Sequence, residues 1–220
     1  MNGKLIVFEG VEGAGKTTQM QLLIHWFQVK CFNIEGWVAT REPGGTELGK
    51  ALRSLLLEQS SDELVSDRAE LLMYTADRTQ HVETFIKPKL AIGTMVFCDR
   101  FTDSTIAYQG YGRGLDFGLI QQLNEIATGG LQSDLTFWLD INVEAGLARV
   151  KARGKCDRME QANLEFHQRV QQGFTELARQ NPDRIVRING DRAEYEVAKE
   201  IQTIFNARLA AWGYSNSSAS

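Results

Sequence analysis

The chain has 220 residues, of which 43% are hydrophobic and 24% are charged, so it can bury a substantial core under an ordinary charged surface. Its formal net charge of −4 provides no broad basic surface for nucleic acid. The three cysteines are too few and too scattered for a disulfide framework or a zinc site, and the first apolar run is too short for a signal peptide or a membrane span. We therefore expect a cytoplasmic protein that binds neither nucleic acid nor membrane.

Short apolar runs alternate with helical patterns along the chain, which is typical of βαβ units and a parallel sheet. No linker or repeat divides the chain, so we expect one α/β domain over residues 1–213 and a disordered tail at 214–220. The predicted elements are, in chain order, a strand at 5–9, a helix with apolar residues at 20, 23, 24 and 27, a strand at 37–41, helices at 48–57 and 69–86, a strand at 94–100, a helix at 118–127, strands at 135–140 and 184–188, and a helix at 193–212.

Glycine-rich or charged segments follow the first three predicted strands. They read EGVEGAGKT from Glu9, REPGG from Arg41 and DRFTDS from Asp99. Ligands of such sheets bind beyond the carboxyl ends of the strands, so we expect the three segments to converge in space.

The first of these segments has the G-x-x-x-x-G-K-[ST] spacing of a phosphate-binding loop, placed between a strand and a helix. Backbone N–H groups of such a loop and the positive end of the helix dipole attract phosphate oxygens. Lys16 can reach the β- and γ-phosphates, and the Thr17 hydroxyl is suited to Mg²⁺. The expected ATP-binding residues of the loop are Gly10, Val11, Glu12, Gly13, Ala14, Gly15, Lys16, Thr17 and Thr18.

Asp99 ends the third predicted strand, where a carboxylate that binds Mg²⁺ directly or through water would lie. A pairing with a nearby arginine is the structural alternative. We expect ATP rather than GTP as the phosphoryl donor, because no guanine-reading Asn-Lys-x-Asp sequence follows any strand.

Four arginines fall in or just after segments that should flank the strand ends. A single exposed arginine is more often a solvated surface residue. Several arginines beside glycine-rich turns favour a phosphate site, because a guanidinium group matches two phosphate oxygens at once. These residues are Arg41, Arg53, Arg78 and Arg100.

Five motifs occur in the order EGVEGAGKTT, TREPGGT, LLMYTADR, DRFTDSTIAYQG and ARGKCDRME. From residue 4 to about 190, the chain resembles bacterial thymidylate kinases, a family of P-loop nucleoside-monophosphate kinases. The resemblance implies a three-layer α/β/α P-loop kinase fold with a five-stranded parallel sheet and a mobile lid at about 149–160. It also implies transfer of the γ-phosphoryl group of ATP to dTMP, giving dTDP and ADP in dTTP biosynthesis, with Mg²⁺ as cofactor and a homodimeric assembly.

The resemblance assigns an acceptor site as well. It implies that Arg41, Arg53 and Arg100 hold the dTMP phosphate. It also implies that Tyr74 stacks on thymine and that Arg78, one helical turn later, hydrogen-bonds the base. Many relatives have phenylalanine at the Tyr74 position. Tyr108 is implied to crowd the sugar C2′, and the whole implied dTMP-binding set is Glu12, Arg41, Arg53, Tyr74, Arg78, Arg100, Ser104, Thr105, Tyr108 and Gln109. Without the resemblance, Tyr74 and Tyr108 would be interpreted as ordinary core aromatics.

Basic residues gather at positions 149–158, and a charge run of this kind is usually a solvated helix face. The family places its lid here. Some relatives carry a loop arginine where this chain has Gly13, so the resemblance favours a lid arginine as the cation that meets the transferred phosphoryl group. Arg153 is the first choice, and Arg149 or Arg158 is the next. The expected catalytic residues are Lys16, Arg100, Arg153 and Glu12, and Arg149 and Arg153 are expected to contact ATP.

Glu12 puts a carboxylate inside a loop that should hold anions. Like-charge repulsion predicts that its side chain points away from the phosphates. It could meet a sugar hydroxyl, an arginine, Mg²⁺-bound water or solvent, and the family pattern places it against the 3′-hydroxyl of dTMP. The attacking dTMP phosphate is already ionised, so no general base is required, and His25, His81 and His167 are expected to be structural or surface residues.

Two other functions remain open from the sequence. The chain could phosphorylate another acceptor, such as dUMP or thymidine. It could also use its P-loop for ATP-dependent switching on nucleic acid, although the acidic balance of charge argues against a basic binding stripe.

Overall fold

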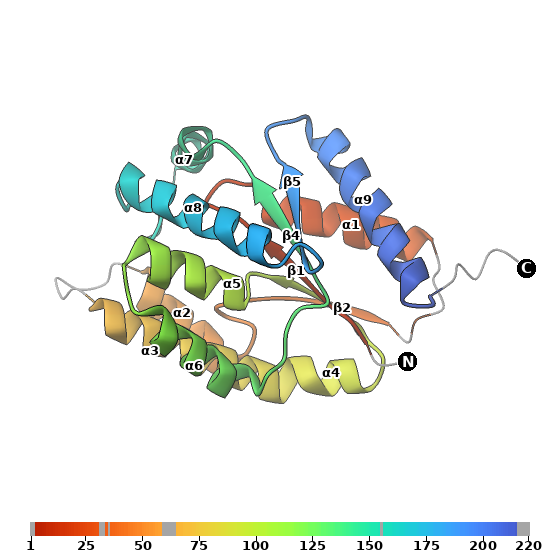
Figure 1. Cartoon of the computed structure of the whole chain (residues 1–220), viewed down its shortest axis with the longest axis horizontal. Helices are drawn as coiled ribbons and strands as arrows, with labels where there is room; N and C mark the ends of the chain where they lie inside the picture. The colour runs from red at the N-terminus through yellow and green to blue at the C-terminus, as the bar shows by residue number, and fades with distance from the viewer. Residues whose placement is uncertain (1–2, 31–33, 35, 59–64, 155, 215–220) are drawn as a thin grey trace, which may run out of the picture.

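A computed structural model describes residues 3–30, 34, 36–58, 65–154 and 156–214. One sheet lies at the centre, with all its strands parallel and in the order β2-β3-β1-β4-β5. Helices cover both faces of this sheet and form the outer layers (Figure 1). The predicted α/β/α P-loop kinase fold is therefore confirmed. The strands are β1 (Leu5–Glu9), β2 (Trp37–Arg41), β3 (Met95–Asp99), β4 (Leu135–Asp140) and β5 (Ile185–Asn189).

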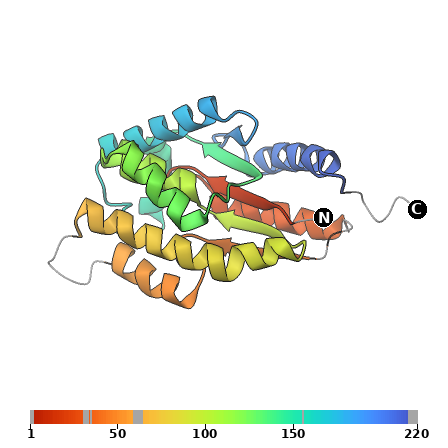
Figure 2. The same cartoon turned by 60° about the horizontal axis from the view of Figure 1, so that its bottom comes forward.

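The helices divide between the two faces. The first and last of them, α1 (Lys16–Val29) and α9 (Glu194–Ala211), pack against each other on one face. On the opposite side, a long helical segment runs through α3, η1 and α4, with α2 and α6 beside it, and α8 packs against η2 (Figure 2). These elements are α2 (Glu47–Leu57), α3 (Asp67–His81), η1 (Val82–Ile86), α4 (Lys87–Ala91), α5 (Thr102–Thr105), η2 (Ile106–Gly112), α6 (Phe117–Thr128), α7 (Val143–Ala152) and α8 (Leu164–Gln180).

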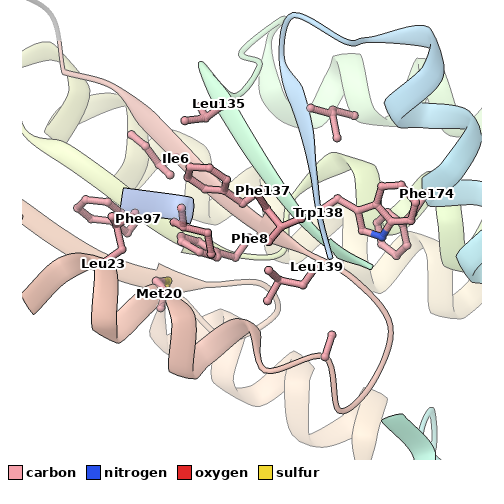
Figure 3. Packing of buried hydrophobic residues seen from close by; sticks show 14 of the residues in the cluster. Ile6, Phe8, Met20, Leu23, Phe97, Leu135, Phe137, Trp138, Leu139 and Phe174 are labelled. Carbon is pink, nitrogen blue, oxygen red and sulfur yellow. The ribbon is translucent and has the colours of Figure 1, made fainter. Parts of the chain in front are cut away.

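The three central strands β1, β3 and β4 are buried on both faces and are apolar almost throughout, whereas the edge strands β2 and β5 are partly exposed. Successive residues of β1 point to opposite faces, and Phe8 therefore packs on the side of α1 while Val7 packs against η1. Figure 3 shows Phe8 beside Phe137, with α1 below them, and the two rings have centroids 5.4 Å apart. This packing holds the carboxyl ends of the central strands at one edge of the sheet.

All five predicted strands are confirmed to within one residue. The predicted helix at 69–86 is in fact α3 followed by the π-helical η1, and α4 continues it to Ala91. The sequence patterns did not predict α7, α8 or the segment formed by α5 and η2. In α8 the apolar residues form only a narrow stripe, and α5 with η2 is rich in serine, threonine and glycine, which have weak helix propensity.

Several expectations concern residues that the structure does not describe. Cys31, Lys155 and the tail at 215–220 lie outside the described residues, so the predicted disorder of the tail is not tested. Tyr214, the last described residue, is buried against the core. Residues 149–152 of the predicted lid belong to the last turns of α7. Among the described helices, none has the length and apolar character needed to cross a membrane.

Candidate active site

The three polar segments that follow β1, β2 and β3 converge, as predicted. In the sheet, Asp99 pairs with Phe8 on one side and with Arg41 on the other. A cavity of about 500 Å³ lies beyond these strand ends. The predicted site residues that line it are Glu12, Gly13, Ala14, Gly15, Lys16, Thr17, Thr18, Arg41, Arg53, Tyr74, Arg78, Asp99, Arg100, Ser104, Thr105, Tyr108, Gln109, Arg149 and Arg153.

The phosphate-binding loop turns tightly between β1 and α1. Gly13 has a φ of 72°, and a Cβ there would lie 2.2 Å from the Gly146 carbonyl oxygen, so only glycine allows the loop to approach α7 this closely. Gly10 and Val11 do not line the cavity, but their carbonyls accept hydrogen bonds from Lys16 Nζ at 3.1 and 2.9 Å. These two hydrogen bonds hold the Lys16 ammonium group on the concave face of the loop, which is the face expected to bind phosphates.

Glu12 points away from this concave face and towards the segment after β3. Its Oε1 accepts hydrogen bonds from Arg100 Nη2 at 2.7 Å and from the Tyr108 hydroxyl at 2.8 Å. Burial alone would raise the pKa of Glu12, but Arg100, Lys16 and the Tyr108 hydroxyl outweigh it and lower the pKa to about 2. Of the alternatives for Glu12, the contact with an arginine is the one the structure contains.

Arg100 is oriented by several contacts at once. Its φ of 69° is unusual for a residue with a side chain. Its Nη1 group donates to the Gly10 carbonyl and to the Ser104 hydroxyl, and the guanidinium group lies 4.8 Å from the centre of the Tyr108 ring. Arg100 thus joins the loop after β1 to the helical segment after β3.

The buried side chain of Glu9 holds the backbone turn that follows Arg100. Glu9 is fully buried and accepts hydrogen bonds from the backbone N–H groups of Phe101 and Ser104 and from the Ser104 hydroxyl. Burial raises the pKa of Glu9 to about 7, and the nearby Asp103 carboxylate adds to the increase. In the sequence, Glu9 is only the last residue of a predicted strand, and no local signal marks its supporting role.

Arg41 and Arg53 lie on either side of the turn at Gly44. A Cβ on Gly44 would come within 3.1 Å of Arg53 and 3.9 Å of Arg41. Arg53 Nη1 donates to the Pro43 carbonyl at 3.0 Å, and the Glu42–Pro43 bond is cis. Burial lowers the pKa of Arg53, and the positive charge of Arg41 lowers it further. Two cations held this close together are typical of an anion site.

Arg78 is almost fully buried, although it lines the cavity. Its Nε donates to Glu42 at 2.7 Å, and its Nη1 group donates to Thr105 and to Asn124. Its Nη2 group donates one hydrogen to the Phe101 carbonyl. The other Nη2 hydrogen has no acceptor among the described residues, so it is the donor that a ligand could use.

Thr17 and Asp99 form the predicted metal pair. The Thr17 hydroxyl donates to Asp99 Oδ2 at 2.8 Å. No group of three or more His, Cys, Asp or Glu side chains in the described ranges is arranged to hold a metal ion. Of the histidines, His25 is exposed, His167 is buried, and His81 is buried between Glu42 and Thr40; none lines the cavity.

The basic residues of the predicted lid have different surroundings. Arg149 Nη1 lies 3.3 Å from the Gly13 carbonyl, and Arg153 pairs with Glu160 at 2.6 Å while its side chain is 62% exposed. Both line the cavity. Arg158 does not, since it donates to the Leu56 carbonyl and to Glu70.

Some cavity residues were missed by the sequence analysis. Asp157 and Glu160 stand in the motif DRME, where adjacent acidic and basic residues resemble a solvated charge run. Glu42 stands beside Arg41 in REPGG, and no local signal distinguishes its carboxylate from a solvated one. The cavity residues that were not predicted are Glu42, Pro43, Leu57, Val150, Asp157, Met159 and Glu160.

A phosphate-binding loop that shares one cavity with an arginine cluster, at the strand ends of a parallel sheet, defines a P-loop kinase that acts on a small phosphorylated acceptor. The thymidylate kinase family model matches residues 8–201. A thymidylate kinase from Trichodesmium erythraeum is 59% identical over 97% of this chain and all of the relative, and one from Nostoc punctiforme is 58% identical over 95% of this chain and 98% of the relative. The crystal structure of thymidylate kinase from Ehrlichia chaffeensis superposes with a TM-score of 0.74 at 36% identity, covering 93% of this chain and 99% of that one.

The chain belongs to the thymidylate kinase family. It transfers a phosphoryl group from ATP to dTMP and forms dTDP, a step of nucleotide biosynthesis. Of the functions left open by the sequence, the kinase of dTMP is the one that these similarities support.

The raised pKa of Glu9 predicts a pH dependence of stability. The pKa of Glu9 rises from 4.5 in the unfolded chain to about 7 in the folded protein, so the folded state binds the proton more tightly. The free energy of unfolding is therefore highest below pH 4.5 and falls as the pH rises to about 7. Between these pH values the wild type should lose on the order of 1–3 kcal/mol relative to Glu9→Gln. Urea denaturation at a series of pH values measures the difference. Exposed Glu58→Gln is the control and should follow the wild type. Parallel curves for the wild type and Glu9→Gln would contradict the assignment.

Proposed function

We propose that the cavity holds ATP and dTMP together, with the donor on the phosphate-binding loop and the acceptor between β2, α3 and the segment after β3. The observation that carries this proposal is that residues of both predicted sets line one cavity. Lys16 would exchange its two carbonyl partners for the β- and γ-phosphates of ATP. Backbone N–H groups at the start of α1 would bind the same phosphates.

Thr17 and Asp99 would hold Mg²⁺. Their hydroxyl and carboxylate oxygens are hard ligands of the kind that Mg²⁺ prefers, and in kinases one or two such side chains with phosphate oxygens and water complete its coordination. When bound, Mg²⁺ neutralises charge on the β- and γ-phosphates. The hydrogen bond between the two side chains supports this assignment because it places their oxygens next to each other.

Arg41, Arg53 and Arg100 would bind the phosphate of dTMP. Besides burial, the positive charges of Arg41 and Arg100 lower the pKa of Arg53. This supports the proposal, because a bound anion would relieve the repulsion between the three cations. The attacking atom is an oxygen of this phosphate, whose second pKa is about 6, so it is mostly ionised at neutral pH. Catalysis then depends on positioning and on charge neutralisation rather than on a general base.

The base would lie against Tyr74, with Arg78 and Gln109 at its polar edge. Arg78 offers its remaining Nη2 hydrogen to O4 of thymine, and the Gln109 oxygen accepts from N3–H. Ser104 and Thr105 close the same side of the cavity. Thymine and uracil match this arrangement, because O4 is an acceptor and N3–H is a donor. Cytosine does not match it, because its 4-amino group is a donor and its N3 is an acceptor.

Glu12 and Tyr108 would meet the deoxyribose. Glu12 is held by Arg100 and Tyr108 and stays ionised, so it can accept a hydrogen bond from the 3′-hydroxyl. The Tyr108 ring, fixed by this contact and by the stacked Arg100, would crowd C2′. The acidic residue of the donor loop therefore belongs to the acceptor.

Arg153, assisted by Arg149, would stabilise charge on the transferred phosphoryl group. Both line the cavity, and Arg149 contacts the Gly13 carbonyl of the phosphate-binding loop, whereas Arg158 is held by Glu70. A cation in this role contributes on the order of 10³–10⁵ in rate in related transfers.

Two single variants separate these roles. Arg41→Ala should raise the KM for dTMP by about tenfold or more, because a charge-assisted phosphate contact is lost, with little change in the KM for ATP. Arg153→Ala should lower kcat by at least about tenfold with smaller changes in either KM, as expected of a contact made mainly in the transition state. A coupled assay of ADP release measures both, and exposed Arg68→Ala is the control. A change in the KM for ATP alone on Arg41→Ala, or unchanged kcat on Arg153→Ala, would contradict the assignments.

We propose further that two copies of the chain form a homodimer through α2, α3 and α6. These helices lie side by side, with α3 in contact with both of the others (Figure 2). Their outer faces carry large apolar side chains: Leu55 is 59% exposed, Leu72 is 56% exposed and Ile126 is 72% exposed. Apolar side chains that gather on adjacent helices are typical of a subunit interface.

Sedimentation equilibrium tests the assembly. The wild type should have twice the mass of one chain, and Leu72→Glu should have the mass of a single chain because it buries a charge in the interface. Tyr195→Glu, at another exposed apolar position, on α9, should remain a dimer. A wild-type mass of one chain would refute the dimer, and dissociation of Tyr195→Glu as well would refute this interface.

A further inference from the structure

Glu70 is a fully buried carboxylate on α3, one turn before Tyr74, and the roles described above do not use it. It accepts a hydrogen bond from Gln109 Nε2 at 2.8 Å. Arg113 donates to both of its oxygens, from Nη2 at 3.0 Å and from Nε at 3.3 Å, and Arg158 donates to Oε2. Glu70 therefore connects η2, the residue after it and the segment that follows α7.

The charge state of Glu70 determines what it can do. Burial alone would raise the pKa of Glu70, but the hydrogen bonds from Arg113 and Gln109 outweigh it, and the pKa is lowered. An ionised carboxylate only accepts hydrogen bonds. It can therefore hold the NH₂ group of Gln109 but not its oxygen.

This contact determines which end of the Gln109 amide is available to a ligand. Gln109 is 2% exposed and lines the cavity. With the nitrogen bound to Glu70, the oxygen is the atom left to face the acceptor base. A rotation of the amide by half a turn would place two oxygens against each other inside the protein, an arrangement with no hydrogen bond and with electrostatic repulsion.

We propose that Glu70 is a positioning residue that fixes the Gln109 amide with its oxygen towards the base, and that it thereby selects pyrimidines with a hydrogen on N3 over pyrimidines with a lone pair there. This inference rests on the proposed contact between Gln109 and the base. Thymine and uracil carry N3–H, whereas N3 of cytosine is an acceptor and would face the Gln109 oxygen without a hydrogen bond.

Glu70→Gln tests the inference, because the new side chain has the same size but carries an NH₂ group. That group can donate to the Gln109 oxygen, so the Gln109 amide can turn and present its own NH₂ to the base. The ratio of kcat/KM for dCMP to kcat/KM for dTMP should rise by about tenfold, the value of one hydrogen bond. The ratio for dUMP to dTMP should stay within about twofold, because these two bases share the same polar edge and differ by a methyl group. A pocket that is merely loosened would change both ratios, and that result would overturn the inference.

Two further variants serve as controls. Arg113→Lys disturbs the same ion pair but leaves Glu70 ionised and bound to Gln109, so its dCMP-to-dTMP ratio should equal that of the wild type. Gln109→Met removes the amide and should weaken the preference for dTMP over dCMP. If Gln109→Met keeps the wild-type ratio, the proposed contact with the base is wrong. If Gln109→Met changes the ratio and Glu70→Gln does not, the contact stands and the role of Glu70 is refuted.

A measurement on the wild type covers the case in which Glu70→Gln does not fold. The side-chain amide signal of Gln109 in the ¹⁵N-labelled protein can be assigned by its loss in Gln109→Met. Without nucleotide, the hydrogen that is bonded to Glu70 should already be protected from exchange with solvent, because it faces a buried carboxylate, and dTMP should not change this protection. Rapid exchange that stops only when dTMP binds would show that the NH₂ group faces the cavity, and it would overturn the inference.

Discussion

The ion pair between Glu12 and Arg100 is the contact on which the arrangement of the site depends. It joins the phosphate-binding loop to the segment after β3 over 2.7 Å, and both side chains are largely withdrawn from water. A charge in such a place needs its partner, since the loss of either one leaves the other buried and unpaired. The backbone of Arg100 adopts a left-handed conformation that its contacts with Gly10, Ser104 and Glu12 make tolerable. The phosphate-binding loop and the segment after β3 are therefore joined by a buried ion pair.

Behind the cavity lies a second group of carboxylates that support the site without lining it. Glu9 holds the turn after Arg100, Asp77 accepts the backbone N–H of Gly44 in the turn after Arg41, and Glu70 holds the amide of Gln109. The cavity itself is lined by arginines and by carboxylates, and these three carboxyl groups stand one layer deeper. Each of them holds a backbone or amide group of the site in one orientation.

Most of the fold could be predicted from the sequence because its signals are local. Each strand is a short apolar run, and the phosphate-binding loop has a fixed spacing between a strand and a helix. The convergence of Arg41, Asp99 and Arg100 followed from the rule that parallel strands end at the same edge. The helix α8 was missed because its apolar stripe is narrow, and η2 was missed because only tertiary contacts compensate for its glycines.

The supporting carboxylates could not be predicted in the same way. Nothing in the local sequence distinguishes Glu70, which is buried beneath Gln109, from Asp67 on the exposed first turn of α3. Their difference arises from η2, whose Gln109 lies 39 residues further along the chain. The partner of Glu12 was left open for the same reason, since only the fold decides which of several cations reaches it.

The central claim, that Glu12 and Arg100 act as one unit in the thymidylate kinase site, is tested most directly by a double-mutant cycle. Calorimetric dissociation constants for dTMP, measured without ATP, are needed for the wild type, Glu12→Gln, Arg100→Met and the double variant. The account predicts that the double variant binds dTMP about as weakly as the weaker single variant, with a coupling energy of at least about 1 kcal/mol. Free-energy losses of the two single variants that add fully in the double variant would contradict it.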